Sequence, residues 1–327
     1  MATTVDAVSR IPAPWTRSLR SPLVRYLAKR VLQAIIVLFL VATVAFFTVR
    51  VSGDPVTALL PENATAEQEQ ALRHILGYDK SLFAQYLSYL EGLVHLDFGR
   101  SVFFQQPAFE VIMERLPTTI SLAWWSLVVA LVVAVPAGIF SAVRRGKSSD
   151  SAVMAGILVG QSTPAFFVGI VLILVFAVQL QVLPASGPGG FDHLILPAIT
   201  LGLYSAAMIA RLLRSSLIDV LSEDYIRTAT AKGLSRHRVV LVDGLRNAGL
   251  PVVTIVGLEI GSLLGGAILT EKVFSLPGLG QLTVEAITHR DYPLIQATVL
   301  FLAIVFVLVN LVVDILYAFL DPRVRLG

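Results

Sequence analysis

Long uncharged apolar segments alternate with short polar ones along most of this chain. No charged residue occurs between Arg115 and Arg144, a run of 28 residues, or between Arg30 and Arg50, a run of 19. At a rise of about 1.5 Å per residue, a helix of either length crosses a bilayer core about 30 Å thick. The pattern predicts an all-α polytopic membrane protein with six transmembrane helices, at about 31–49, 118–143, 152–178, 194–213, 250–270 and 294–320.

Lysine and arginine gather in the loops on one side of these spans. The N-terminal tail holds six, the second-to-third loop holds Arg144, Arg145 and Lys147, and the fourth-to-fifth segment holds seven, from Arg211 to Arg246. The turn-rich loop between the third and fourth spans has none. Short loops rich in Lys and Arg remain in the cytoplasm, so both termini are expected to be cytoplasmic.

The spans divide the chain into a cytoplasmic tail (1–27), a first span (28–50), an extracytoplasmic helical insertion (51–116), a core with the other five spans (117–320) and a cytoplasmic C-terminus (321–327). The insertion is expected to begin with a turn at Gly53-Asp54-Pro55. Apolar residues at helical spacing then predict two short amphipathic helices, marked by Leu72, Ile75 and Leu76, and by Leu82, Tyr86, Leu87, Leu90 and Leu93. We expect a cap on the membrane surface; direct contact with a substrate is the alternative.

Composition narrows the function classes. Hydrophobic residues make up 56% of the 327-residue chain and charged residues 14%, against about 25% charged in soluble domains, which excludes a soluble enzyme. The chain has no cysteine, so disulfide frameworks and Cys-ligated metals are excluded. The net charge is +3. The basic residues flank the spans and are interpreted as topology signals, so no nucleic-acid partner is expected.

Candidate catalytic motifs fail on inspection. Gly146-Lys147-Ser148 resembles the end of a phosphate-binding loop, but position 141 is Ser141 instead of the required glycine. The segment also follows a membrane helix, whereas that motif needs a preceding strand. No span combines a nucleophile with a base. We therefore expect no catalytic, cofactor or metal site on this chain.

The polar segment 214–249 predicts two short helices between two spans. Ser222 can cap a helix whose first turn carries Glu223 and Asp224, and Gly233 is suited to end it. Ser235 can then cap the next helix. A short helix surfaced with Ala and Thr suits a groove in another protein, and an interfacial connector is the alternative.

Charged residues within the spans are costly and normally face the bundle interior or water. Glu259 lies roughly opposite Gly257, Gly261 and Gly265, a small-residue stripe that permits close helix contact. We expect the glycines to pack against a neighbour, and Glu259 and Ser262 to face a transport pathway. A Glu259 hydrogen-bonded to another helix is the alternative. Asp314 is expected to pair with a basic residue.

Several of these segments together resemble a known family. The stretch 224–235, the segment 246–251 that closes the same loop and the motifs 273–280, 290–293 and 320–323 occur in the expected order, with Gly53-Asp54-Pro55 and 162–166 also fitting. The chain resembles, over about 23–327, the inner-membrane permease subunit of bacterial ATP-binding-cassette (ABC) importers, in the dipeptide/oligopeptide/nickel branch. The resemblance implies a type I ABC importer permease fold.

The resemblance also implies partners: a second homologous permease, two cytoplasmic ATPase domains that bind ATP and Mg²⁺, and an extracytoplasmic substrate-binding protein. This chain would bind no cofactor itself. The coupling loop (214–249) would dock into the ATPases, and the residues matched to that role are Asp224, Tyr225, Arg227, Ala229, Ala231, Lys232, Gly233 and Leu234. Glu259 stands where the family leads us to expect a neutral polar residue.

The implied function is ATP-driven import of di- and oligopeptides across the cytoplasmic membrane by alternating access. Nickel chelates, glutathione or another small solute remain the alternative ligands for the same machinery. A secondary transporter is a further alternative, but such a protein needs midplane substrate and ion sites, often on inverted repeats. The sequence shows one candidate intramembrane acid there and no clear repeat.

Overall fold

The computed structural model describes every residue except 1–21, 52–55, 57–59, 61–64, 76 and 321–327. The described residues are almost all helical, and their one β-type pairing is an isolated bridge between Arg100 and Pro107. The expected turn at Gly53-Asp54-Pro55, the marker Leu76 and the C-terminal motif from Asp321 onward lie outside the described residues. The helices are α2 (Pro22–Val51), α4 (Ala66–Ile75), α5 (Leu82–Val94), α6 (Ala108–Val143), α7 (Ser148–Ser162), α8 (Ala165–Leu172), η1 (Ile173–Gln179), α9 (Asp192–Leu221), α10 (Asp224–Ala231), α11 (Arg236–Arg238), η2 (Val239–Gly244), α12 (Leu245–Val273), α13 (Leu279–Thr288) and α14 (Tyr292–Leu320).

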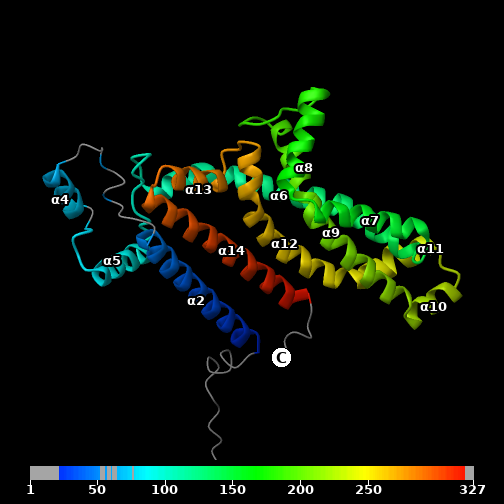
Figure 1. Ribbon diagram of the computed structural model, residues 1–327. Helices are drawn as coiled ribbons and strands as arrows, with labels where there is room; N and C mark the ends of the chain where they lie inside the picture. Colours follow the sequence, from blue (N-terminus) through cyan, green and yellow to red (C-terminus); the bar gives the residue numbers. More distant parts are fainter. Residues whose placement is uncertain (1–21, 52–55, 57–59, 61–64, 76, 321–327) are drawn as a thin grey trace, which may run out of the picture.

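Long helices form the body of the molecule, and a pair of short helices lies at each of its two ends (Figure 1). Helices α4 and α5 lie at one end, called here the α5 end, and α10 and α11 lie at the other, the α10 end. Helix α6 is longer than its predicted span, because it begins at Ala108. It therefore runs across the expected boundary between the insertion and the core at 116/117.

Five helical segments are continuous and apolar enough to span a membrane, and the sixth predicted span is broken. Helix α7 and the α8–η1 segment meet at an angle of 100°, which corrects the expectation of a single helix over 152–178. Thr163 has an extended conformation with ψ of 129°, as expected for a residue before proline. Pro164 has no N–H with which to continue the helical hydrogen bonds.

Helices α6 and α9 pack along each other at the centre of the bundle. Small residues face the contact, and a Cβ added to Gly202 would lie 2.5 Å from the carbonyl oxygen of Ser126. A Cβ on Gly138 would lie 3.0 Å from the carbonyl oxygen of Ala210. Only glycine permits this backbone approach, which is typical of helix pairs in membranes.

Buried carboxylates tie together the loops at the α5 end. Asp291 is 1% exposed and accepts hydrogen bonds from Ser101 Oγ (2.5 Å) and from the backbone N–H groups of Phe103 (3.0 Å) and Leu294 (3.2 Å). Its carboxylate therefore joins the loop before α6 to the first turn of α14. Asp291 belongs to the 290–293 motif named in the sequence analysis, and this motif therefore has a structural role.

Two polar contacts attach the first long helix to its neighbours. Arg30 on α2 pairs with Asp314 on α14 at 3.1 Å, which confirms the expected basic partner of Asp314. Near the other end of α2, Arg50 donates to Gln85 Oε1 on α5 through both Nε (3.2 Å) and Nη2 (3.0 Å). Helix α5 is thereby held against the end of α2.

Candidate functional site

The α10 helix and its following turn form a compact unit with well-defined ends. Gly233 has φ of +80°, its N–H donates to Thr230 O (3.0 Å), and the Leu234 N–H donates to Ala229 O (3.3 Å). This pair of bonds is a Schellman motif, so the prediction that Gly233 ends the helix is confirmed. Ser235 Oγ accepts from the Arg238 N–H at 3.4 Å, which confirms Ser235 as the cap of the next helix.

The start of α10 differs from the prediction. The N-cap is Glu223, in an extended conformation and without a side-chain cap hydrogen bond. Ser222 instead ends α9, where its Oγ donates to Asp219 O at 2.6 Å. The prediction of Ser222 as the cap is therefore wrong, because the preceding long helix continues up to that residue. Asp224 remains in the first turn of α10, where its charge favours the helix dipole.

One face of α10 anchors it and the other is exposed. Ile226 is buried at 5% exposure and holds the helix to the bundle. The Tyr225 hydroxyl accepts a hydrogen bond from Asn247 Nδ2 on α12 at 2.9 Å. The remaining predicted docking residues are partly or fully exposed: Asp224, Arg227, Ala229, Ala231, Lys232, Gly233 and Leu234. The structure thus brings all eight residues together on one short helix and its turn.

A cavity of about 320 Å³ separates this unit from the end of α6. Thr230, Leu234 and Arg236 line one side, and Ala142 and Val143 line the other. Arg236 Nη2 reaches across to the carbonyl oxygen of Val143 at 3.4 Å. Arg236 on α11 therefore contacts the end of α6 beside the turn between α6 and α7.

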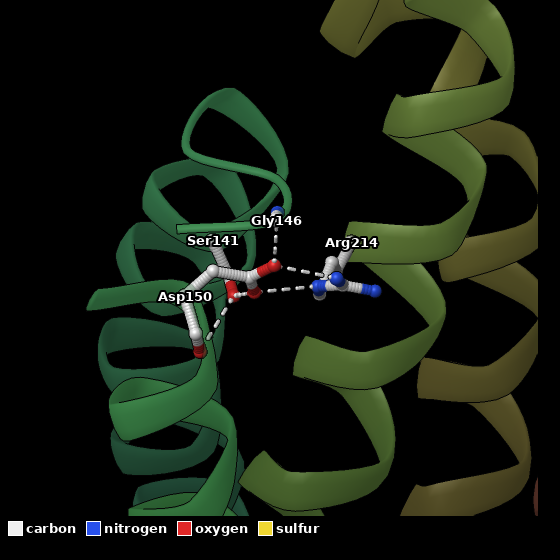
Figure 2. A network of polar contacts seen from close by, with 4 residues as sticks. All are labelled: Ser141, Gly146, Asp150 and Arg214. Carbon is white, nitrogen blue, oxygen red and sulfur yellow. Dashed lines mark hydrogen bonds and ion pairs between the residues drawn. The ribbon is translucent and has the colours of Figure 1, made fainter. Parts of the chain in front are cut away.

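A polar network holds that turn in place (Figure 2). Asp150, which is 3% exposed, accepts from Arg214 Nε (2.8 Å) and Nη2 (2.7 Å) on α9. It also accepts from Ser141 Oγ at the end of α6 and from the Gly146 N–H (3.1 Å). A bidentate Arg–carboxylate pair is both strong and directional, so the network joins the ends of α6, α7 and α9.

This network was not predicted from the sequence. There, Arg214 is one of seven basic residues between the fourth and fifth predicted spans, and Asp150 lies ahead of the third. Two features of the sequence could have indicated the pair. Asp150 lies at the start of one apolar helix and Arg214 lies late in another, and charged residues in such helices need partners.

The residues of α12 that the sequence analysis names, Glu259, Ser262 and the three glycines, have different neighbours. Glu259 is buried at 6% exposure and accepts a 2.5 Å hydrogen bond from Ser205 Oγ on α9. A Cβ on Gly257 would lie 2.2 Å from Val313 on α14, and one on Gly261 would lie 2.9 Å from Phe306. Gly265 has no atom within 4 Å of an added Cβ, and Ser262 is exposed. Gly257 and Gly261 therefore pack on α14, whereas Gly265 shares the open face with Ser262.

The described residues contain no group of three His, Asp or Glu side chains arranged to hold a metal ion. The prominent features are instead an exposed docking-type helix, a braced turn beside it and buried carboxylates within long apolar helices. These features are suited to transmitting movement between a membrane bundle and another protein.

Comparison with known proteins agrees with this arrangement. Residues 134–326 match the family described as "Binding-protein-dependent transport system inner membrane component", and residues 23–123 match the N-terminal model of the same system. The "Glutathione transport system permease protein GsiC" of Escherichia coli K12 is 44% identical over 304 residues, covering 93% of this chain and 99% of the relative. The protein of the same name from Shigella dysenteriae serotype 1 shows the same identity and coverage.

Solved structures show the same fold at low sequence identity. Two inward-facing crystal forms of the MetNI methionine ABC transporter match with TM-scores of 0.58 and 0.54, at 18% and 19% identity. Each alignment covers 66% of this chain and 98% of the other. The expected type I ABC importer permease fold is thereby confirmed. This chain belongs to the family of binding-protein-dependent transport system inner membrane components, the multi-pass permease subunits of ABC importers.

Proposed function

We propose that this chain is one of two permease subunits of an importer for small peptides, and that its α10 unit docks on an ATPase subunit. The exposed α10 helix, anchored through Ile226 and closed by the Schellman turn at Gly233, is the observation that carries this proposal. Its outer surface of small and polar residues can enter a groove without disturbing the bundle. The sequence has no complete phosphate-binding loop, which supports ATP binding by the partner.

The proposed sidedness follows from the basic loops. Arg144, Arg145 and Lys147 lie in the turn between α6 and α7 at the α10 end, and the positive-inside rule assigns that end to the cytoplasm. Both termini would then be cytoplasmic. The α4–α5 cap would face outward, where a substrate-binding protein delivers its ligand.

The braced turn supports coupling between docking and the pathway. A displacement of α10 or α11 acts on Val143 through Arg236 and on α9 through Arg214 and Asp150. Binding and hydrolysis of ATP by the partner would favour one arrangement of the long helices over another. The solute would move because the favoured state changes the side on which the pathway is open.

Glutathione is the first solute to test within the proposed class. It is a tripeptide, and relatives 44% identical over nearly their whole length are named glutathione permeases. Linear di- and oligopeptides share its size range and its free carboxylate. Nickel chelates remain the alternative cargo of the same machinery.

Reconstitution tests the proposal directly. The chain, its second permease, the ATPases and the binding protein would be purified together and placed in proteoliposomes. Uptake of labelled glutathione or of a linear tripeptide that requires ATP and the binding protein is expected. Uptake of a nickel chelate alone would contradict the peptide assignment, and uptake without ATPase subunits would contradict the importer mechanism.

A further inference from the structure

One side of α9 is exposed within an otherwise buried helix. Tyr204 is 45% exposed, and Arg211, seven residues later on the same side, is also exposed. Met208 lies between them, and its sulfur is 3.0 Å from Arg211 Nη2. The neighbouring Ser205 faces a different side of the helix, toward Glu259 on α12. Tyr204, Met208 and Arg211 are named here the α9 stripe.

The guanidinium of Arg211 points away from the α10 end. Arg214 reaches Asp150 on the first turn of α7, whereas Arg211 donates from Nη2 to Gln161 Oε1 on the last turn of α7, at 2.8 Å. Helices α7 and α9 are therefore antiparallel. Asp150 and Gln161 are eleven residues apart, about 16 Å along a helix. Arg211 thus reaches toward the bend at Thr163-Pro164 instead of toward the proposed cytoplasmic surface.

A charge in this position requires water or a partner. Arginines in spanning helices either extend toward the nearer interface or face a bundle interior or aqueous cavity, because exposure to lipid is costly. Arg211 extends away from the nearer interface, and it has no carboxylate partner within the described part of the chain. Both hydrogen bonds that Arg211 makes to described residues, to Gln161 and to Met208, come from Nη2. The Nε and Nη1 donors remain for a solute.

We propose that Arg211 is a substrate-binding residue that binds the carboxylate of the transported solute in the aqueous pathway. Guanidinium groups bind carboxylates through two parallel hydrogen bonds, and Gln161 holds the side chain in position. Tyr204 and Met208 supply an amphipathic surface beside it. The inference rests on the proposed function, because it names the chemical class of ligand for the same pathway.

The first test measures access of water to Arg211 and needs no transport. Since the chain has no cysteine, Arg211→Cys introduces a single thiol. In the assembled complex in nanodiscs, this thiol should react with the water-soluble sulfonatoethyl methanethiosulfonate in at least one nucleotide state. Leu40→Cys on the exposed face of α2 is the matched control and should remain unreactive. An Arg211→Cys thiol that is unreactive with and without ATP would overturn the inference.

The second test measures transport of glutathione from its loaded binding protein at saturating concentration. Arg211→Gln should lower uptake at least fivefold, and Arg211→Lys should have an intermediate effect. Lys272→Gln, which removes an exposed cation from the last turn of α12, should leave uptake unchanged. Unchanged uptake by the Arg211→Gln complex would overturn the assignment. Purification of the Arg211→Gln chain without the second permease would also overturn it, because Arg211 would then be an ion-pair residue between the two subunits. Failure of the wild-type complex to import glutathione would count against the proposed function, while thiol labelling would still decide the position of Arg211.

Discussion

Glu259 and Asp150 are both buried acids on long apolar helices, but their surroundings differ. Asp150 accepts hydrogen bonds from three residues, one of them through both oxygens of a bidentate ion pair. Glu259 has one described hydrogen bond, from the neutral Ser205. A carboxylate with so few fixed donors is suited to exchanging partners during transport, whereas one held from three directions is suited to bracing.

Glu259→Gln separates charge from hydrogen bonding. The glutamine amide oxygen can still accept from Ser205 Oγ, so the folded chain should lose less than about 1 kcal/mol of stability. If Glu259 faces the pathway, removal of its negative charge should change the rate of solute uptake in proteoliposomes. An uptake rate identical to wild type would restrict Glu259 to joining α9 and α12.

Asp150→Asn should destabilise the α10 end. The substitution breaks a bidentate ion pair, and partial exposure of Arg214 allows some rehydration, so we expect a loss of about 2–3 kcal/mol. Thermal unfolding in detergent should show a Tm lower by roughly 5 °C. Glu69→Gln, which removes a more exposed ion pair with Arg73, should change stability by less than about 1 kcal/mol. Equal effects of the two substitutions would contradict the bracing role.

At the scale of elements, α13 depends on a buried carboxylate at its first turn. Glu271 accepts from Thr119 Oγ1 (2.6 Å) and from the N–H groups of Gly280 (2.7 Å) and Gln281 (3.1 Å). The N-terminal N–H groups of a helix need such acceptors. The glycines in the 273–280 motif keep the space open, because a Cβ on Gly278 would lie 2.2 Å from the Glu271 carboxylate.

Gly280→Ala tests this packing. An added Cβ would lie 2.3 Å from Cα of Ile268, and backbone cannot move aside as a side chain can. We expect a loss of about 2 kcal/mol or more, measured as a lower Tm of the chain in detergent. Gly156→Ala on α7, where an added Cβ meets no atom within 4 Å, should be neutral or stabilising by up to about 1 kcal/mol. A neutral Gly280→Ala would show that α13 is loosely packed.

The sequence predicted the positions of the helices better than it predicted bends within them and contacts between them. Uncharged runs located the long helices, and Gly233 and Ser235 marked the boundaries of α10 and α11 because capping is a local property. The 100° bend after Ser162 was not predicted, since Pro164 indicates a break but tertiary packing determines its angle. The Asp150–Arg214 pair was also missed, because it joins residues 64 positions apart.

At the scale of the whole molecule, the bundle has a tightly joined centre and two specialised ends. Helices α6 and α9 are held together by Gly138 and Gly202, and the loops at the α5 end are joined through Asp291. The α10 unit, by contrast, is joined to the bundle through Ile226, Tyr225 and Arg236. This contrast allows the α10 unit to engage a partner while the bundle keeps its own packing.

Docking of this permease on an ATPase through the α10 unit can be tested by co-purification. The chain is purified in mild detergent, and all bound proteins are identified by mass spectrometry. The wild-type chain should recover a second six-span permease together with ATPase subunits. Ala231→Glu, which places a charged side chain on the exposed docking surface, should lose the ATPases but retain the second permease. Ala71→Glu, the same change at an exposed position of α4, should retain both. Recovery of the wild-type chain without any ATPase, or of Ala231→Glu with its full complement of ATPase, would contradict the account.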